Sequence, residues 1–300
     1  MTSPDEDRRT GAVHAVAAYG LWGMLPLYFV TLAPAGSLEI LGCRILFSVV
    51  VAAILIRWQH GWGRMRTALR DRRVMLTLAA AAALIFVNWL TYITAATSGH
   101  VVETSLGYFI NPIVTVLLGV VVLRERLRPL QWAAIGVSAL AIVVLVAAYG
   151  QVPVIALTLA FSFGLYGLLK RQVSGRVDGL SGLAIETILL IPAAGLLIAV
   201  VSSWGQLTLL DHGPVHFALL AFSGIATLVP LLFFAGAAKR LPLAHLGLFQ
   251  YLAPILQLLT GVLILHEPMP ATRWIGFAIV WLAVFMLVVD VLIVGRRGRA

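Results

Sequence analysis

Ionisable residues inside long apolar segments are the strongest candidates for chemistry in this sequence. Arg44 stands about seven residues inside segment 38–56, roughly 10 Å from its start at about 1.5 Å per residue, and Glu186 stands inside segment 180–202. A charge at bilayer depth costs about 2.5 to 3.5 kcal/mol on insertion scales, so it marks a functional candidate by default. We predict that Arg44 and Glu186 line or gate a pathway. A structural ion pair or a snorkelling side chain is the alternative for each.

Glu103, near the start of segment 101–122, is the third ionisable candidate. Glu39 lies about 140° around a helix from Arg44, so the two do not share a face and Arg44 is expected to pair across helices. Glu103 is the partner that we predict; the alternative is that Glu103 carries a coupling proton. His100 and Glu103 share a helix face, but no third ligand stands nearby, so no metal site is predicted.

Polar and aromatic side chains inside other apolar segments could contact a ligand. Trp22 and Tyr166 stand in the similar stretches AYGLWG and SFGLYG, where glycines permit close packing and the paired aromatics could line a cavity. Bonding between helices is the commoner role of polar residues in a membrane bundle, and it stays the alternative. The residues with amide or hydroxyl groups suited to a ligand are Asn88, Tyr108, Asn111, Gln250, Tyr251 and Gln257.

The composition places these candidates in a membrane protein. Hydrophobic residues make up 61% of the 300 residues and charged residues 11%, whereas soluble domains carry about 25% charged residues. A membrane helix needs about 20 apolar residues. We therefore predict an all-α integral membrane protein with ten transmembrane helices, over residues 11–31, 38–56, 74–96, 101–122, 130–149, 152–169, 180–202, 215–236, 243–265 and 271–294.

The basic residues fall on one side of this predicted arrangement. When loops are assigned to alternating sides, all 21 Lys and Arg residues lie on the side of the N-terminus except Arg44 and Arg273. Short loops rich in Lys and Arg stay cytoplasmic, so we predict both termini in the cytoplasm. The basic stretch 57–73 holds Trp58 and Trp62, which suit the headgroup level. We interpret it as a lipid anchor at an anionic leaflet, and nucleic acid is not a predicted partner.

One stretch of the chain occurs twice. Residues 106–132 recur 142 positions downstream, with Pro112 matched by Pro254 and Glu125 by Glu267. Two unrelated apolar segments of similar composition are the alternative, but they would not readily match proline and glutamate in register. Proline in a membrane helix frees a backbone carbonyl and permits a bend, so we predict that Pro112 and Pro254 are a symmetric pair of hinges. Glu125 and Glu267 lie just past matching helix ends and are interpreted as loop anchors.

The repeat divides the chain into two halves, residues 1–150 and 151–300, with five predicted helices in each. Because five is odd, the second half must cross the membrane in the opposite sense. Inverted-topology repeats of this kind are a recurring plan of secondary transporters, with the substrate site between the halves.

Other function classes lack the residues that they need. Cys43 is the only cysteine, which excludes an internal disulfide and a Cys metal cluster. The sequence has no P-loop, HExxH or GxSxG motif, so ATP coupling and intramembrane proteolysis have no support. No cofactor and no enzyme activity are predicted.

A family resemblance rests on motifs that follow one another along nearly the whole chain. They are AAYGLWGMLPLYF (17–29), EILGCR (39–44), NWLTYI (88–93), ETSLGYFINPIV (103–114), LRERL (123–127), LAFSFGLYGLLKR (159–171), IETILLIP (185–192) and LGLFQYLAP (246–254). These motifs resemble the RarD proteins, in the EamA branch of the drug/metabolite transporter superfamily.

This resemblance implies ten helices as two inverted five-helix repeats in a bacterial cytoplasmic membrane, and export of a small metabolite or drug. RarD proteins are commonly labelled chloramphenicol-sensitivity or resistance permeases, a label that does not establish a substrate. Relatives of known architecture enclose a central cavity formed by both halves. The residues that the resemblance implies for its wall are Trp22, Asn88, Tyr108, Asn111, Tyr166 and Gln250.

The function predicted from these features is secondary-active transport by alternating access, in which the halves rock about a midplane cavity. The predicted partner is a small-molecule substrate, driven by a proton gradient or by its own gradient. A channel or facilitator is the alternative, and saturable flux distinguishes the transporter from it. A membrane-embedded enzyme would change its substrate chemically, and a non-transporting membrane protein would bind partners without flux. The sequence predicts no oligomeric state.

Overall fold

The computed structural model describes residues 4–59, 61–124, 127–149, 152–173, 175–238, 240–241, 246 and 248–297, and every regular element within them is a helix. The helices are α1 (Pro4–Val30), α2 (Ser37–Trp58), α3 (Trp62–Arg70), α4 (Arg72–Thr97), α5 (Val101–Leu123), α6 (Pro129–Tyr149), α7 (Val154–Val173), α8 (Gly179–Leu189), α9 (Ile191–Ser203), α10 (Gly213–Ala238), α12 (Leu252–Leu259), the π-helical turn η1 (Thr260–Ile264) and α13 (Ala271–Arg297).

Most of these helices are long and apolar enough to cross a bilayer. Within the described residues, seven single helices meet the length and hydropathy of a span, and an eighth span results if α8 and α9 are counted together. The apolar stretches Pro129–Val144 in α6 and Leu252–Ile264 in α12 and η1 are shorter. The chain is therefore a multi-pass helical membrane protein, and ten crossings stay a prediction.

Two of the predicted segments are not straight helices. Segment 180–202 is bent by 44° between α8 and α9, with Pro192 in the first turn of α9. A proline at the start of a helix lacks only an N–H that would have no intrahelical partner, so it suits a break at this point. The second irregular segment, 243–265, passes through a turn at Gln250 and Tyr251 before α12 and continues into the π-helical turn.

The two prolines of the predicted hinge pair occupy different helical contexts. Pro112 lies inside α5, which continues without interruption around it. Pro254 lies in the first turn of α12, just after the turn that interrupts its segment. The helix is thus interrupted next to Pro254 but not at Pro112, although the two prolines are matched in the sequence repeat. A symmetric pair of hinges stays a prediction.

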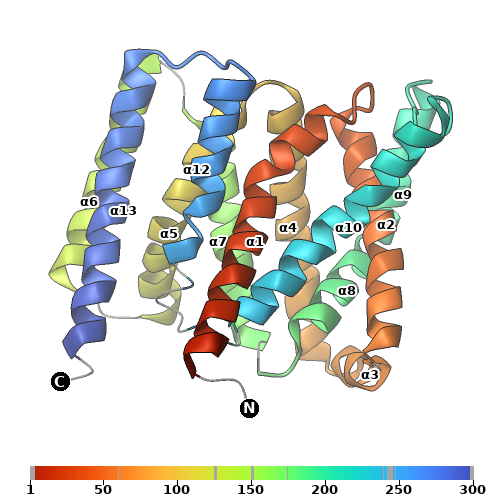
Figure 1. Cartoon of the computed structure of the whole chain (residues 1–300), viewed down its shortest axis with the longest axis horizontal. Coiled ribbons are helices and arrows are strands. Elements are labelled where there is room, and N and C mark those ends of the chain that lie inside the picture. Colours follow the sequence, from red (N-terminus) through yellow and green to blue (C-terminus); the bar gives the residue numbers. More distant parts are fainter. Residues whose placement is uncertain are drawn as a thin grey trace.

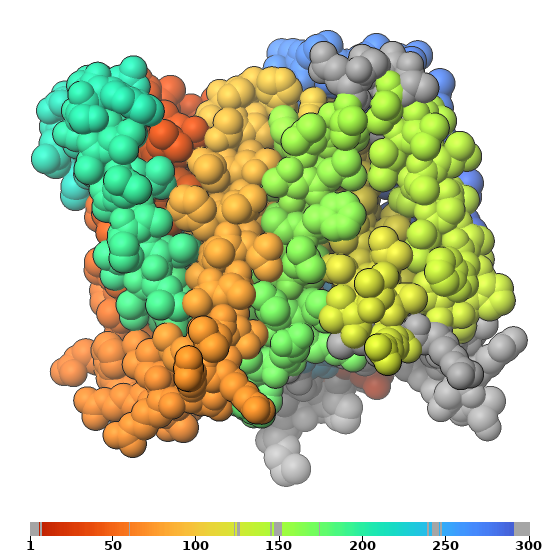
Figure 2. Space-filling view, turned by 180° about the vertical axis from the view of Figure 1, so that it is seen from behind, coloured from red at the N-terminus to blue at the C-terminus, as the bar shows by residue number. Residues whose placement is uncertain are grey.

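The helices stand side by side, and their termini define two edges (Figure 1). The start of α1, the end of α13 and the short helix α3 lie together at the lower edge, whereas the turn between α9 and α10 lies at the upper edge. Seen from behind, α4 lies between α7 on one side and α8 on the other, and a hollow separates α7 from α6 (Figure 2). At this end of the molecule α6 packs mainly against α13.

The lower edge carries an amphipathic helix with its arginines in solvent. In α3, Met65 and Ala68 are buried, while Arg64, Arg66 and Arg70 are exposed. This pattern suits a helix lying in the interface plane.

A carboxylate ends this interfacial segment by capping the next helix. The carboxylate of Asp71 accepts hydrogen bonds from the backbone N–H groups of Val74 and Arg73, and these bonds lower the pKa of Asp71 below its ordinary value. Asp71 also pairs with Arg176 of the α7–α8 connection at 3.3 Å. The cap therefore fixes where α4 begins, next to the exposed arginines of α3.

Candidate functional site

Arg44 is buried at a junction of four helices. It lies on α2, only 5% exposed, and its Nε donates a hydrogen bond to Oγ1 of Thr227 on α10 at 2.8 Å. Its guanidinium carbon lies 4.5 Å from the ring centre of Trp89 on α4 and 5.6 Å from that of Phe29 on α1. Cation–π contacts of this kind compensate part of the lost hydration of a buried cation.

The predicted ion pair between Arg44 and Glu103 is wrong. Glu103 pairs with Arg273 at 3.5 Å, because the first turn of α5 lies beside the start of α13, whereas Arg44 faces α1, α4 and α10. Among the residues that the structure describes, Arg44 forms no ion pair, and its Nη1 has no hydrogen-bond partner. A buried guanidinium stays protonated, so an uncompensated positive charge is held inside the bundle.

Tyrosine rings extend this cluster toward α5. The ring centre of Tyr92 lies 5.9 Å from that of Phe29 and 5.8 Å from that of Tyr108. Tyr92 is buried and its hydroxyl has no hydrogen-bond partner. Tyr108 donates its hydroxyl to Oδ1 of Asn88 at 3.2 Å. We call Phe29, Arg44, Trp89, Tyr92, Tyr108 and Thr227 the arginine cluster.

Asn88 and Asn111 use their amides to join helices. Nδ2 of Asn88 donates to Oγ of Ser162 at 3.0 Å and to the carbonyl of Leu159 at 3.2 Å, both on α7. Nδ2 of Asn111 donates to the carbonyl of Ala160, also on α7, at 3.0 Å. Both amides therefore stabilise the packing of α7 against α4 and α5, the commoner role of such residues in a bundle.

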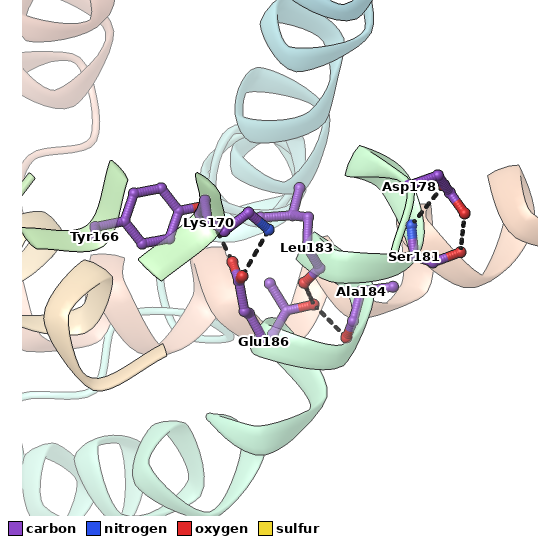
Figure 3. A network of polar contacts seen from close by, with 8 residues as sticks. Tyr166, Lys170, Asp178, Ser181, Leu183, Ala184 and Glu186 are labelled. Carbon is purple, nitrogen blue, oxygen red and sulfur yellow. Dashed lines mark hydrogen bonds and ion pairs between the residues drawn. The ribbon is translucent and has the colours of Figure 1, made fainter. Parts of the chain in front are cut away.

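Glu186, unlike Arg44, is paired with an opposite charge (Figure 3). Its carboxylate is 0% exposed and accepts a hydrogen bond from Nζ of Lys170 at 2.7 Å and one from the hydroxyl of Tyr166 at 3.1 Å. Both partners project from α7 toward α8. The structure thus contains the ion pair named as the alternative for Glu186, and a role of Glu186 in a pathway stays a prediction.

Two other candidates lie away from the arginine cluster. Trp22 packs against Tyr19 at 5.4 Å and Phe234 at 5.9 Å between ring centres, in a separate aromatic group formed by α1 and α10. Gln250 lies in the turn before α12 and is half-buried. Tyr166, by contrast, is linked to Tyr108 through the ring of Phe163.

Glu267 caps the start of α5, a contact that the predicted role as a loop anchor did not specify. Its carboxylate accepts hydrogen bonds from the backbone N–H groups of Val101 at 2.6 Å and Val102 at 2.8 Å, the first two residues of α5. A carboxylate at a helix N-terminus is favourable because it satisfies free N–H groups and interacts with the helix dipole. Glu125, its sequence counterpart, lies outside the described residues.

Sequence reasoning did not find four members of the arginine cluster, Phe29, Trp89, Tyr92 and Thr227. Thr227 carried no signal, because a threonine in an apolar segment is unremarkable. Trp89 and Tyr92 follow Asn88 in NWLTYI, and Tyr92 lies one helical turn beyond Asn88. That spacing could have indicated a shared face, but which helix the face contacts depends on packing.

Comparison with known proteins relates the whole chain to one family. The profile of the EamA-like transporter family matches residues 9–147 and again residues 152–289. Protein RarD of Streptomyces exfoliatus is 46% identical over 99% of this chain and 93% of its own length. Protein RarD of Escherichia coli (strain K12) is 37% identical over 96% of this chain and 97% of its own length. An uncharacterized transporter of Vibrio cholerae is 37% identical over 100% of this chain and 98% of its own length.

A solved crystal structure supports the same fold. It superposes with a TM-score of 0.58 and covers 93% of this chain and 97% of its own, at 17% sequence identity. Together with the full-length relatives, the two profile matches establish a bacterial multi-pass membrane transporter of the drug/metabolite type: the chain belongs to the EamA-like transporter family.

Proposed function

We propose that this protein is a secondary-active transporter that exports a small metabolite or drug from the cytoplasm by alternating access. The observation that carries the proposal is the arginine cluster, in which α1, α2, α4 and α5 of the first half and α10 of the second half bring a buried cation and aromatic rings together. A charge between the two halves of a membrane bundle is expensive and marks a substrate or ion pathway.

Inverted repeats are part of this proposal, and the helix packing supports them. Under the repeat α7, α10 and α12 correspond to α1, α4 and α5. In the structure α4 packs on α7 and α10 packs on α1. In the same way α5 packs on α7 and α12 packs on α1. Exchanging the halves therefore preserves these contacts.

Backbone geometry supports the same correspondence. Among the described residues, two non-glycine residues have positive φ, Arg124 at 55° and His266 at 53°. They are 142 positions apart, the offset of the sequence repeat, and each follows the end of its helix. This conformation is uncommon for side chains other than glycine, so a coincidence at matched positions is improbable.

The test of the proposed function is flux of an unmodified solute through the purified protein. We expect proteoliposomes loaded with a cytoplasmic metabolite extract to release a subset of solutes, identified by mass spectrometry, faster than protein-free liposomes do. Release should saturate and be stimulated by the same solute on the opposite side, because one site alternates between two faces. An imposed pH gradient tests proton coupling.

Three results would contradict this proposal. Flux that rises linearly with solute concentration would favour a channel. Chemical conversion of a solute would favour an enzyme. Release equal to that of protein-free liposomes for every solute would favour a membrane protein without transport activity.

A labelling experiment tests the opposite orientation of the halves. Gln59 follows the end of α2 and Gln206 lies three residues past the end of α9; these helix ends correspond in the two repeats, and both side chains are exposed. In a Cys43→Ala background, we expect an impermeant maleimide added to intact cells to label Gln206→Cys but not Gln59→Cys, with both labelled after lysis. Labelling of both variants in intact cells would contradict the inverted arrangement and the cytoplasmic termini.

A further inference from the structure

The two intramembrane charges at matched repeat positions are compensated differently. Glu186 has the ammonium group of Lys170 at 2.7 Å and a tyrosine hydroxyl as a second partner. Arg44, 142 positions earlier, has one hydrogen bond to Thr227 and two aromatic rings, but no anion among the described residues. Glu186 is thus neutralised by Lys170, whereas Arg44 has no counter-charge among the described residues.

Unused polar groups lie next to the Arg44 charge. Nη1 of Arg44 and the hydroxyl of Tyr92 are both buried and without a hydrogen-bond partner. Both side chains border the ring of Phe29. The guanidinium carbon of Arg44 lies 5.6 Å from the centre of this ring, and the ring centre of Tyr92 lies 5.9 Å from it. Other buried side-chain atoms also lack a partner among the described residues, but these two border the same aromatic ring, and buried polar groups are usually satisfied, so this pair is available to donate to a ligand.

We propose that Arg44 and Tyr92 bind the carboxylate of the transported solute, and that Phe29, Trp89 and Tyr108 contact its apolar body. This inference rests on the proposed transport function and adds the substrate class, a small organic carboxylate. A guanidinium presents its N–H groups as a planar fork that matches a carboxylate. The aromatic neighbours favour an apolar, preferably aromatic, body.

The charge count favours a carboxylate over a phosphate. One carboxylate carries one negative charge and neutralises one guanidinium. A phosphate monoester carries close to two charges at neutral pH and calls for a second cation. Lys170, the cation that pairs with the other intramembrane charge, is already neutralised by Glu186. A dianion in the arginine cluster would therefore keep an uncompensated charge in a buried site.

Binding to the full-length protein in detergent tests this assignment. The probes are benzoate and phenylacetate, with benzamide and phenylacetamide as neutral isosteres and phenyl phosphate as the dianion. We expect the two carboxylates to raise the thermal unfolding temperature and to bind measurably by calorimetry, and the amides and phenyl phosphate to bind at least about tenfold more weakly.

Substitutions separate the site from a general effect of anions. Arg44→Gln should weaken carboxylate binding about ten- to a hundredfold, and Tyr92→Phe should weaken it several-fold, because each removes a hydrogen bond to the anion. Arg44→Lys keeps the charge but loses the planar fork, so intermediate binding is expected. Arg273→Gln, a matched loss of an arginine beside Glu103, should leave binding unchanged. If Arg44→Gln does not fold, Arg44→Lys and Tyr92→Phe carry the test.

Several outcomes overturn the inference. They are carboxylates that do not bind the wild type, amides or phenyl phosphate that bind as tightly as the carboxylates, and variants of Arg44 and Tyr92 that bind like the wild type. Failure of this inference is distinguishable from failure of the proposed function. Solute flux that is unaffected by Arg44→Gln would leave a transporter without the carboxylate site. Arg44-dependent benzoate binding without flux of any solute would leave the site without the transporter.

Discussion

Replacing Lys170 by methionine is expected to lower the free energy of unfolding by about 3 kcal/mol. The substitution removes the cation beside a carboxylate that is 0% exposed, and breaking a buried pair from one side leaves an uncompensated charge. Lys170 itself is 25% exposed, which places the expected cost at the lower end of the range for buried pairs. Chemical denaturation of the purified protein in detergent measures this difference.

A double substitution isolates the ion pair from other effects of losing the lysine. Adding Glu186→Gln to Lys170→Met should recover most of the lost stability, because the neutral amide needs no counter-charge and can still accept the hydrogen bond of Tyr166. Arg176→Met is the matched control: its ion pair with Asp71 is 58% exposed on the arginine side, so it is screened by water and its loss should change the stability little. If Lys170→Met and Arg176→Met lower the free energy of unfolding equally, the Lys170–Glu186 pair contributes no more than an exposed ion pair.

Replacing Gly224 by alanine is expected to destabilise the protein by about 1 to 3 kcal/mol through overpacking. A Cβ atom at Gly224 of α10 would lie 2.5 Å from the carbonyl carbon and oxygen of Phe47 on α2, and 2.9 Å from the backbone nitrogen of Ser48. No flexible side chain can move aside there, so the two helices must separate. Small residues are what permits such close approach in membrane bundles.

The effect should also reach the arginine cluster. Thr227 lies one turn beyond Gly224 on the same face of α10 and accepts the hydrogen bond of Arg44. Gly136→Ala is the control, because a Cβ atom there meets nothing within 4 Å; we expect unchanged or slightly higher stability from the better helix propensity of alanine. Denaturation of both variants measures the contrast, and a Gly224→Ala protein as stable as Gly136→Ala would mean that α2 and α10 are not held by this contact.

The sequence predicted the features that depend on composition, spacing and local geometry. The helical membrane class follows from long apolar segments. The place of Glu267 just past a helix end indicated an anchor for its loop, but not that its carboxylate caps α5.

What could not be predicted depends on how each helix is rotated against its neighbours. The expected partner of Arg44 was Glu103, since both lie near the same predicted surface, but α5 turns Glu103 toward Arg273. Thr227 comes from a helix more than 180 residues away in sequence, and no periodicity indicates that contact. For the same reason Asn88 could equally have faced a solute or a neighbouring helix until its bonds to α7 were known.

The cap on α5 restricts how the central helices can move. Glu267 follows η1 and holds both N–H groups at the start of α5, while Oγ of Ser105 one turn later donates to the carbonyl of Pro254 in α12 at 2.7 Å. These bonds tie α5 to α12 and η1 near the upper edge of Figure 1. If the two halves rock as proposed, α5 and α12 would separate least at that edge and most at the opposite edge, where the exposed arginines of α3 lie.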